Sequence, residues 1–170
     1  MRLQYLSDFE LPANVSATTD LAEAMAGVQL IIHALPCQKT PEWFAEHRDA
    51  IPSDVLICST VKGLFLPTKQ LIGHAILEAL GREQPIAFLS GPSFSIEIMK
   101  DYPTSVVVAS RELFHATLVQ RVLSNMFLRV HVHAQSNLPV ACDTSAFFDS
   151  LLVVTDTRLR MWWACSWAGR

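Results

Sequence analysis

Glycine is scarce in this sequence, and its spacing excludes one common kind of phosphate-binding loop. The 170 residues contain six glycines, and no two lie close enough to form the Gly-x-Gly-x-x-Gly fingerprint. Charged residues are also few, at 17%, and the formal net charge of −3 comes without any basic run. We therefore expect no nucleic-acid partner.

Disulfide and metal-binding patterns are missing as well. None of the four cysteines forms a Cys-x-x-Cys pair, which fits buried, unreactive thiols in a reducing compartment. The six histidines show no metal-ligand spacing, so we expect no metal site.

Long apolar runs are absent from both ends of the sequence. Met1 to Glu10 has no continuous apolar stretch, so we predict neither a signal peptide nor secretion. The apolar segment Leu151 to Trp167 is interrupted by Asp156, Arg158 and Arg160. It is too short and too charged to span a bilayer.

Apolar residues make up 51% of the chain and alternate between strand-like and helix-like patterns. This alternation is typical of right-handed βαβ units and predicts an α/β fold with a mostly parallel sheet and flanking helices. Strands are predicted at Val15–Thr18, Val28–Leu35, Val55–Ser59, Ile86–Leu89, Ser105–Ala109 and Leu128–Val132, and the main helices at Thr40–Ala50, Pro67–Leu80 and Glu112–Met126.

The alternation stops near Gln135. We therefore predict a partial dinucleotide-binding domain over residues 1–134 and a divergent tail over residues 135–170, with Ser136 to Arg170 poorly packed or irregular. As an alternative, Leu151 to Val154 supplies a substitute strand to an exposed edge of the sheet.

The most informative segment is Leu-Ser-Gly-Pro-Ser-Phe-Ser-Ile-Glu, from Leu89 to Glu97. Gly91 lets a ligand approach the backbone, and Ser93 is a suitable cap for the helix that follows. A strand that leads into a helix N-terminus in this way is suited to binding phosphate, because the free N–H groups of the helix point at the anion. Lys62 follows the preceding strand, so we expect Lys62 and Ser93 to face one cleft at the carboxyl edge of the sheet. The alternative is an ordinary turn and a solvated lysine.

The sequence resembles the NAD(P)-dependent glycerol-3-phosphate dehydrogenases of the bacterial and plastid type. The resemblance runs from about Tyr5 to about Val132. Its longest blocks are Ile86 to Glu97 and Tyr102 to Ser110. Shorter blocks in matching order are Tyr5–Leu6, Leu11–Pro12, Ala17–Leu21, Leu35–Gln38 and Lys62–Gly63.

The resemblance implies a Rossmann-like fold, and an oxidoreductase that interconverts dihydroxyacetone phosphate and sn-glycerol 3-phosphate with NAD or NADP as cofactor. It implies that Lys62, Gly91 and Ser93 bind the small phosphate substrate. It also implies that Tyr5, Lys62 and Ser95 border the cofactor. A cytoplasmic or organellar location, in a plastid or a glycosome, is expected for such an enzyme.

The sequence departs from this family in two respects. It lacks the glycine fingerprint, so we predict a sheet without the first βαβ unit. In the family a catalytic lysine lies in a Gly-Ala-x-Lys-Asn context, but no lysine here follows Lys100, so no catalytic residue is assigned. We therefore expect this chain alone to be inactive and to bind the cofactor poorly.

Loss of the first unit would leave strand Val28 to Leu35 as an exposed apolar edge. Such an edge could pair with another subunit or with a second copy of the chain. The competing functions are thus an enzyme of the resembled family, a non-catalytic fragment that pairs through this edge, and a small phosphate-binding module.

Overall fold

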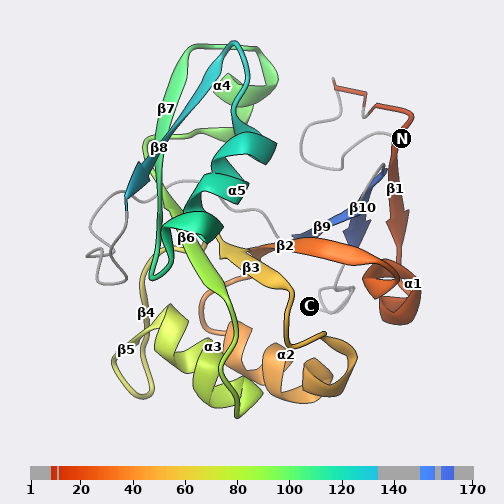
Figure 1. Cartoon of the computed structure of the whole chain (residues 1–170), viewed down its shortest axis with the longest axis vertical. Helices are drawn as coiled ribbons and strands as arrows, with labels where there is room; N and C mark the ends of the chain where they lie inside the picture. The colour runs from red at the N-terminus through yellow and green to blue at the C-terminus, as the bar shows by residue number, and fades with distance from the viewer. Residues whose placement is uncertain (1–8, 11, 134–149, 156–157, 163–170) are drawn as a thin grey trace, which may run out of the picture.

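An eight-stranded sheet with helices on its faces organises the chain (Figure 1). The computed structural model describes residues 9–10, 12–133, 150–155 and 158–162, the last two ranges by their backbone alone. The strands are ordered β1-β10-β9-β2-β3-β6-β7-β8. Their bounds are β1 Val15–Thr18, β2 Val28–Ala34, β3 Leu56–Ser59, β6 Ile86–Ser90, β7 Thr104–Ser110, β8 Leu128–His133, β9 Ser150–Thr155 and β10 Arg158–Trp162.

The sheet is mostly parallel, as the alternating pattern predicted. Parallel pairs join β1 to β10, β2 to β3, β3 to β6 and β7 to β8, whereas β10–β9, β9–β2 and β6–β7 are antiparallel. The architecture is Rossmann-like, with the parallel strands β2, β3 and β6 at its centre.

Helices cover both faces of the central strands. They are α1 Leu21–Met25, α2 Thr40–His47 with the 3-10 turn η1 Arg48–Ala50, α3 Ile72–Leu80, α4 Ser95–Met99 and α5 Leu113–Leu123. On one face α1, α2 and α3 pack on Ile31 and Ile57. On the other face α5 packs on Leu30 and Cys58. Consecutive buried residues thus belong to opposite cores, which explains the continuous apolar runs of these strands.

Several helix ends follow from local sequence, and one does not. The Asp20 carboxylate accepts hydrogen bonds from the amides of Ala22 and Glu23, as expected of an N-cap. Gly81 ends α3 with a φ of 65°. The prediction that this helix begins at Pro67 was wrong. The chain first forms a hairpin, with β4 Leu64–Phe65 paired to β5 Gln70–Leu71, so α3 starts only at Ile72.

The prediction of an irregular tail is wrong for two segments of the tail. Ser150–Thr155 and Arg158–Trp162 form β9 and β10, and β9 pairs with β2 in the register Ile31↔Val153. The edge of β2 is therefore not exposed. The alternative prediction, that Leu151 to Val154 supplies a substitute strand at this edge, is confirmed. Residues 134–149, 156–157 and 163–170 lie outside the described residues, and a domain boundary at residue 134 stays a prediction.

No helix in the described part of the chain combines the length and apolar character that a membrane crossing requires. The longest, α5, has 11 residues.

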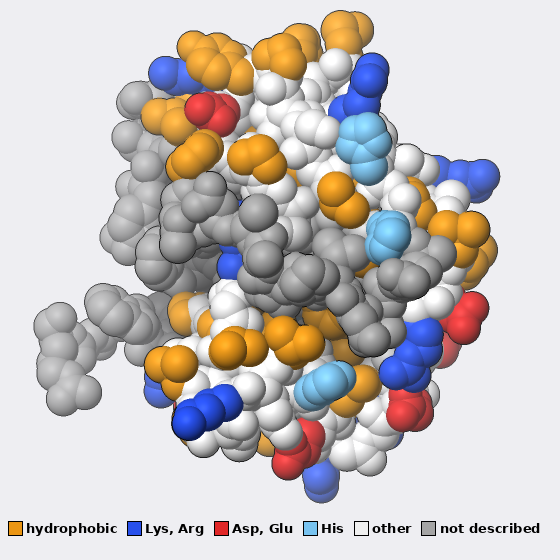
Figure 2. All heavy atoms as spheres, turned by 90° about the vertical axis from the view of Figure 1, so that its left-hand side faces the viewer, with side chains coloured by type: hydrophobic (Ala, Val, Ile, Leu, Met, Phe, Trp, Pro, Cys, Tyr) orange, Lys and Arg blue, Asp and Glu red, His pale blue; other side chains and the backbone are white. Residues whose placement is uncertain are grey.

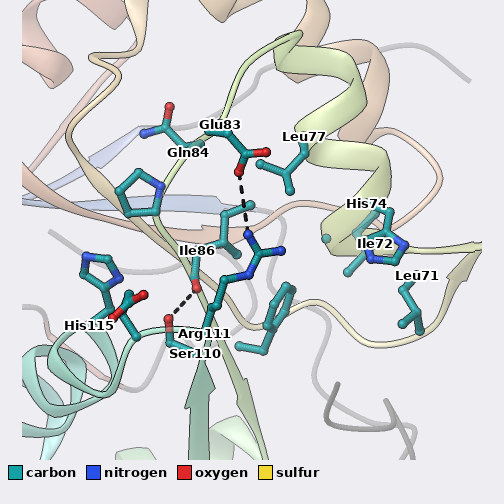
Figure 3. A pocket seen from close by; sticks show the side chains of 14 residues that line it. Leu71, Ile72, His74, Leu77, Glu83, Gln84, Ile86, Ser110, Arg111 and His115 are labelled. Carbon is teal, nitrogen blue, oxygen red and sulfur yellow. Dashed lines mark hydrogen bonds and ion pairs between the residues drawn. The ribbon is translucent and has the colours of Figure 1, made fainter. Parts of the chain in front are cut away.

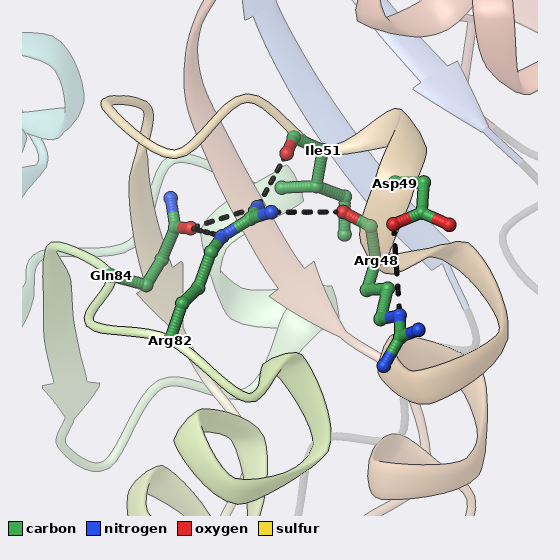
Figure 4. Close-up of polar contacts among 5 residues, drawn as sticks. All are labelled: Arg48, Asp49, Ile51, Arg82 and Gln84. Atoms are coloured by element: carbon green, nitrogen blue, oxygen red, sulfur yellow. Dashed lines mark hydrogen bonds and ion pairs between the residues drawn. The ribbon is translucent and has the colours of Figure 1, made fainter.

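Polar side chains join β3 to β6 at the amino ends of these strands (Figure 4). Arg82 donates to the carbonyls of Arg48, at 3.2 Å, and of Ile51, and to the side-chain oxygen of Gln84. Gln84 in turn donates to the Pro52 and Val55 carbonyls. The loop before β3 is thereby tied to the loop before β6, which fixes where both strands begin.

A buried histidine joins β2, β3 and α2. His33 is fully buried, with Nδ1 3.1 Å from Ser59 Oγ and Nε2 3.0 Å from Thr40 Oγ1. Thr40 uses its hydroxyl proton on the Pro36 carbonyl, so its oxygen must accept from His33 Nε2–H. Nδ1 then accepts from Ser59. Both ring nitrogens are satisfied in the neutral state, and burial lowers the pKa of His33 from 6.5 to about 3.

This depressed pKa predicts acid sensitivity. The unfolded chain takes up a proton at His33 as the pH falls below 6.5, whereas the folded chain does not until about 3. The contribution of neutral His33 to the free energy of unfolding is therefore complete above pH 6.5 and is lost as the pH falls towards 3. Between pH 7 and pH 5 we expect a loss of about 2 kcal/mol in the free energy of unfolding.

The measurement is urea denaturation at both pH values, with His33→Gln compared with His74→Gln at an exposed histidine on α3. Most of the acid sensitivity should disappear in His33→Gln and persist in His74→Gln. Equal pH dependence in the two variants would refute the role of His33.

Candidate functional site

The carboxyl ends of β3 and β6 bring two loops together. The strands are parallel neighbours, with Ile57 opposite Ile86 and Ser59 opposite Phe88, so the loops that follow them leave the same edge of the sheet. Lys62, in the loop after β3, donates from Nζ to the Gly91 carbonyl at 3.0 Å. The two loops therefore meet at one edge of the sheet, as expected, and a cleft shared by Lys62 and Ser93 stays a prediction.

The Lys62 loop is anchored to β2. The amide of Thr60 donates to the His33 carbonyl at 2.9 Å, and its hydroxyl donates to the same oxygen at 3.1 Å. The backbone of His33 therefore positions the start of this loop, while its buried ring holds Ser59 at the end of β3. Lys62 itself is half-buried.

The backbone of residue 91 packs so closely against β7 that only glycine fits at this position. A Cβ at this position would lie 2.9 Å from both the Ser105 carbonyl oxygen and Val106 Cα, which no real Cβ tolerates. The Gly91 carbonyl is also the centre of the turn. It accepts from Lys62 Nζ, from the Ser93 amide at 2.9 Å and from Ser93 Oγ at 3.4 Å.

The structure corrects the prediction that Ser93 caps the next helix. The N-cap residue of α4 is Phe94, and Ser93 turns its hydroxyl back to Gly91 instead. Ser95 is the first residue of α4, and among the described residues no hydrogen bond links its side chain to Lys62. Tyr5 lies outside the described residues. The structure thus brings together Lys62, Gly91 and Ser93, and their roles in binding remain predictions.

Apolar side chains are exposed around the same edge of the sheet. They lie on α4 and on the turns beside it, where the Thr104 amide donates to the Phe127 carbonyl at 2.8 Å. Figure 2 shows hydrophobic side chains gathered at the top of the molecule, the end that carries α4 in Figure 1. The exposed residues of this region are Phe94, Ile96, Tyr102, Met126 and Phe127.

A cavity of about 340 Å³ opens elsewhere, between α3, the start of β6 and the start of α5 (Figure 3). Leu71, Leu77 and Phe88 contribute its apolar lining, and Ser110 beside it donates to the Ile86 carbonyl at 2.8 Å. Because β7 runs antiparallel to β6, the end of β7 meets the start of β6, away from Gly91. None of the site residues predicted from the sequence lines this cavity, and no sequence motif indicated it.

Thiol and metal chemistry find no support in the described residues. Burial raises the pKa of Cys58 to about 12 and also raises that of the half-buried Cys37. Both thiols are therefore protonated at neutral pH and are weak nucleophiles. No group of three or more His, Cys, Asp or Glu side chains within the described ranges could hold a metal ion.

Comparisons with known proteins point to one enzyme family. The family model described as "NAD-dependent glycerol-3-phosphate dehydrogenase N-terminus" matches residues 2–116. The chain is 38% identical over 128 residues to the chloroplastic glycerol-3-phosphate dehydrogenase (NAD(+)) of Oryza sativa subsp. japonica, covering 75% of this chain and 29% of that protein. It is 31% identical over 128 residues to the NAD(P)+ enzyme of Oleidesulfovibrio alaskensis, covering 75% and 39%.

Among solved structures, the glycerol-3-phosphate dehydrogenase of Coxiella burnetii is similar with a TM-score of 0.70 and 25% identity. The likeness covers 76% of this chain and 39% of that one. In each of these relatives the chain spans well under half of the length.

The packing at Gly91 is testable by substitution. Gly91→Ala should reduce the free energy of unfolding by about 1–3 kcal/mol, because the new methyl group collides with the backbone of β7. Gly63→Ala is the control, since a Cβ at Gly63 meets nothing within 4 Å although its φ is also positive, at 108°. Urea denaturation checks both variants. A loss for Gly91→Ala no larger than that for Gly63→Ala would contradict the packing argument.

Proposed function

Because the chain belongs to the family of the NAD-dependent glycerol-3-phosphate dehydrogenase N-terminus, we propose that it carries the substrate-side half of such a domain. In this proposal the chain binds dihydroxyacetone phosphate or sn-glycerol 3-phosphate at the turn formed by Lys62, Gly91 and Ser93. The observation that carries the proposal is the 3.0 Å contact of Lys62 Nζ with the Gly91 carbonyl. It lies where neighbouring parallel strands end, the usual ligand position of open α/β sheets.

The chemistry of this turn suits a phosphate ester. The Lys62 ammonium has three N–H donors, and the Gly91 carbonyl accepts one of them. The others are available to phosphate oxygens or to the substrate carbonyl. Partial burial of Lys62 strengthens its attraction for an anion, because less water screens the charge. The Ser93 hydroxyl already donates to the Gly91 carbonyl at 3.4 Å, so it would have to turn away from that carbonyl to donate to a phosphate oxygen.

The cofactor of the family fits this chain poorly. NAD or NADP would supply or accept the hydride, and by resemblance Tyr5, Lys62 and Ser95 would border it. The Gly-x-Gly-x-x-Gly loop that holds the pyrophosphate is absent from these 170 residues, and β9, the strand beside β2, contains no glycine. No lysine after Lys100 can provide the family's acid–base group. We therefore propose binding of the substrate without turnover by this chain alone.

The proposed location is the cytoplasm or an organelle such as a plastid. The chloroplastic rice relative supports this location. The proposed partner is a small phosphate ester. Pairing with another chain through β2 is not proposed, because β9 already occupies that edge.

Substrate binding depends on Lys62 in this proposal. Titration of the 170-residue chain with dihydroxyacetone phosphate, followed by calorimetry, should give saturable binding. Lys62→Ala should weaken it at least about tenfold, the effect of losing one charge-assisted hydrogen bond. Lys100→Ala, at an exposed lysine after α4, is the control and should bind as the unaltered chain does. Equal affinity of Lys62→Ala and Lys100→Ala, with both folded by circular dichroism, would reject the site.

Turnover is expected to be absent. The chain should not oxidise NADH or NADPH in the presence of dihydroxyacetone phosphate, because the pyrophosphate loop and the acid–base lysine are missing. The absorbance of the reduced nicotinamide at 340 nm, a standard assay wavelength, measures this directly. Turnover that disappears in Lys62→Ala would overturn the prediction.

A further inference from the structure

Two strands from the tail fill two central places of the sheet. A doubly wound dinucleotide-binding sheet has the strand order 3-2-1-4-5-6. Here β2, β3 and β6 follow one another as strands 4, 5 and 6 would, and β1 lies three places from β2, as strand 3 would. The places of strands 2 and 1 are taken by β10 and β9.

The direction of β9 is opposite to that of the strand it replaces. It runs antiparallel to β2, with Ile31 opposite Val153 and Ala34 opposite Ser150. Strand 1 of a dinucleotide-binding sheet would run parallel to this neighbour. The start of β9, rather than its end, therefore lies at the carboxyl edge of β2, where a nucleotide-binding loop would begin.

The connection between the two strands also differs. Only two residues, 156–157, separate β9 from β10, which is enough for a hairpin. A parallel pair would need a crossover of a dozen or more residues, usually a helix. The two-residue connection between β9 and β10 is too short for a helix, so it offers no helix N-terminus to the pyrophosphate of a dinucleotide.

The hairpin also joins two parts of the sheet. In the described sheet β1 pairs only with β10, and the edge of β2 away from β3 pairs only with β9. Leu30 and Ile31 of β2 are buried, at 1% and 0% exposure, so an open edge here would leave backbone groups of a core strand without partners. The sequence of β9, Ser-Leu-Leu-Val-Val-Thr, is apolar and rich in residues that favour strands.

We propose that the β9–β10 hairpin is a built-in replacement for the first two strands of the nucleotide-binding unit. It completes the sheet beside β2, and among the described residues it occupies the place where the strands that carry a pyrophosphate loop would lie. The described residues thus form a continuous sheet from β1 to β8 that keeps the turn at Lys62 and Gly91. The inference rests on strand order and direction, independently of what Lys62 binds.

A designed disulfide tests the placement of β9. Opposed residues of antiparallel strands have Cα atoms about 4.5–5.5 Å apart, within the range of a disulfide. Ala34→Cys combined with Ser150→Cys should therefore form a cross-link under mild oxidation, identified as a joined peptide by mass spectrometry. The control pairs Ala34→Cys with Thr155→Cys at the far end of β9, about 17 Å away at 3.4 Å per residue, and should not cross-link. Absence of the first cross-link, or equal yields of both, would overturn the proposal.

A second variant tests whether β9 completes the sheet. Val153→Pro removes one backbone donor from β9, whereas Val153→Thr keeps it. Hydrogen exchange of the β2 amides in the full chain should rise at least tenfold in Val153→Pro and stay unchanged in Val153→Thr. Unchanged exchange in both variants would refute the pairing.

The cofactor provides the last test. Millimolar NADH or NADPH should leave the midpoint temperature of thermal unfolding of the unaltered chain unchanged. A saturable rise in this temperature would show that the chain binds the dinucleotide and would contradict the proposal. Binding of dihydroxyacetone phosphate enters none of these readouts, so this inference and the proposed function can fail separately.

Discussion

The parallel register of β3 with β6 is the constraint on which the site depends. It places the loop after Ser59 and the turn after Ser90 at one edge, within reach of a single lysine side chain. A shift of one residue would turn every side chain of the shifted strand to the opposite face and exchange its two cores. Arg82 and Gln84 tie together the loops before the two strands, and the hydrogen bond between His33 and Ser59 holds the carboxyl end of β3 against β2.

The His33 cluster shows how a polar group can serve in a core. A buried imidazole without partners would cost several kcal/mol, but each ring nitrogen here has a hydroxyl partner. The cluster links a strand, its neighbour and a helix, and the His33 carbonyl holds Thr60 at the root of the Lys62 loop. Core packing and the geometry of the candidate site thus share one set of hydrogen bonds.

The sequence predicted the central strands and the meeting of Lys62 with the Gly91 turn, because both follow from short apolar runs and from strand ends. It did not predict the hairpin before Ile72, since a two-residue strand has no periodicity to detect. The role of Ser93 was also missed, because its hydroxyl can bond to Gly91 as readily as it can cap a helix. The cavity near Phe88 arises from the packing of α3, β6 and α5, which no local pattern encodes.

The pairing of β2 with β9 has a consequence for the order of folding. Ile31 and Val153 lie about 120 positions apart in the sequence, yet they are neighbours in the middle of the sheet. Contacts of such separation form late, because a long loop must close before they contribute stability. During synthesis, β2 can pair with β3 as soon as residue 59 has left the ribosome, but its other side stays open until β9 arrives. Until β9 has been synthesised, that side of β2 has no partner among the described strands, and an unpaired apolar strand edge favours aggregation.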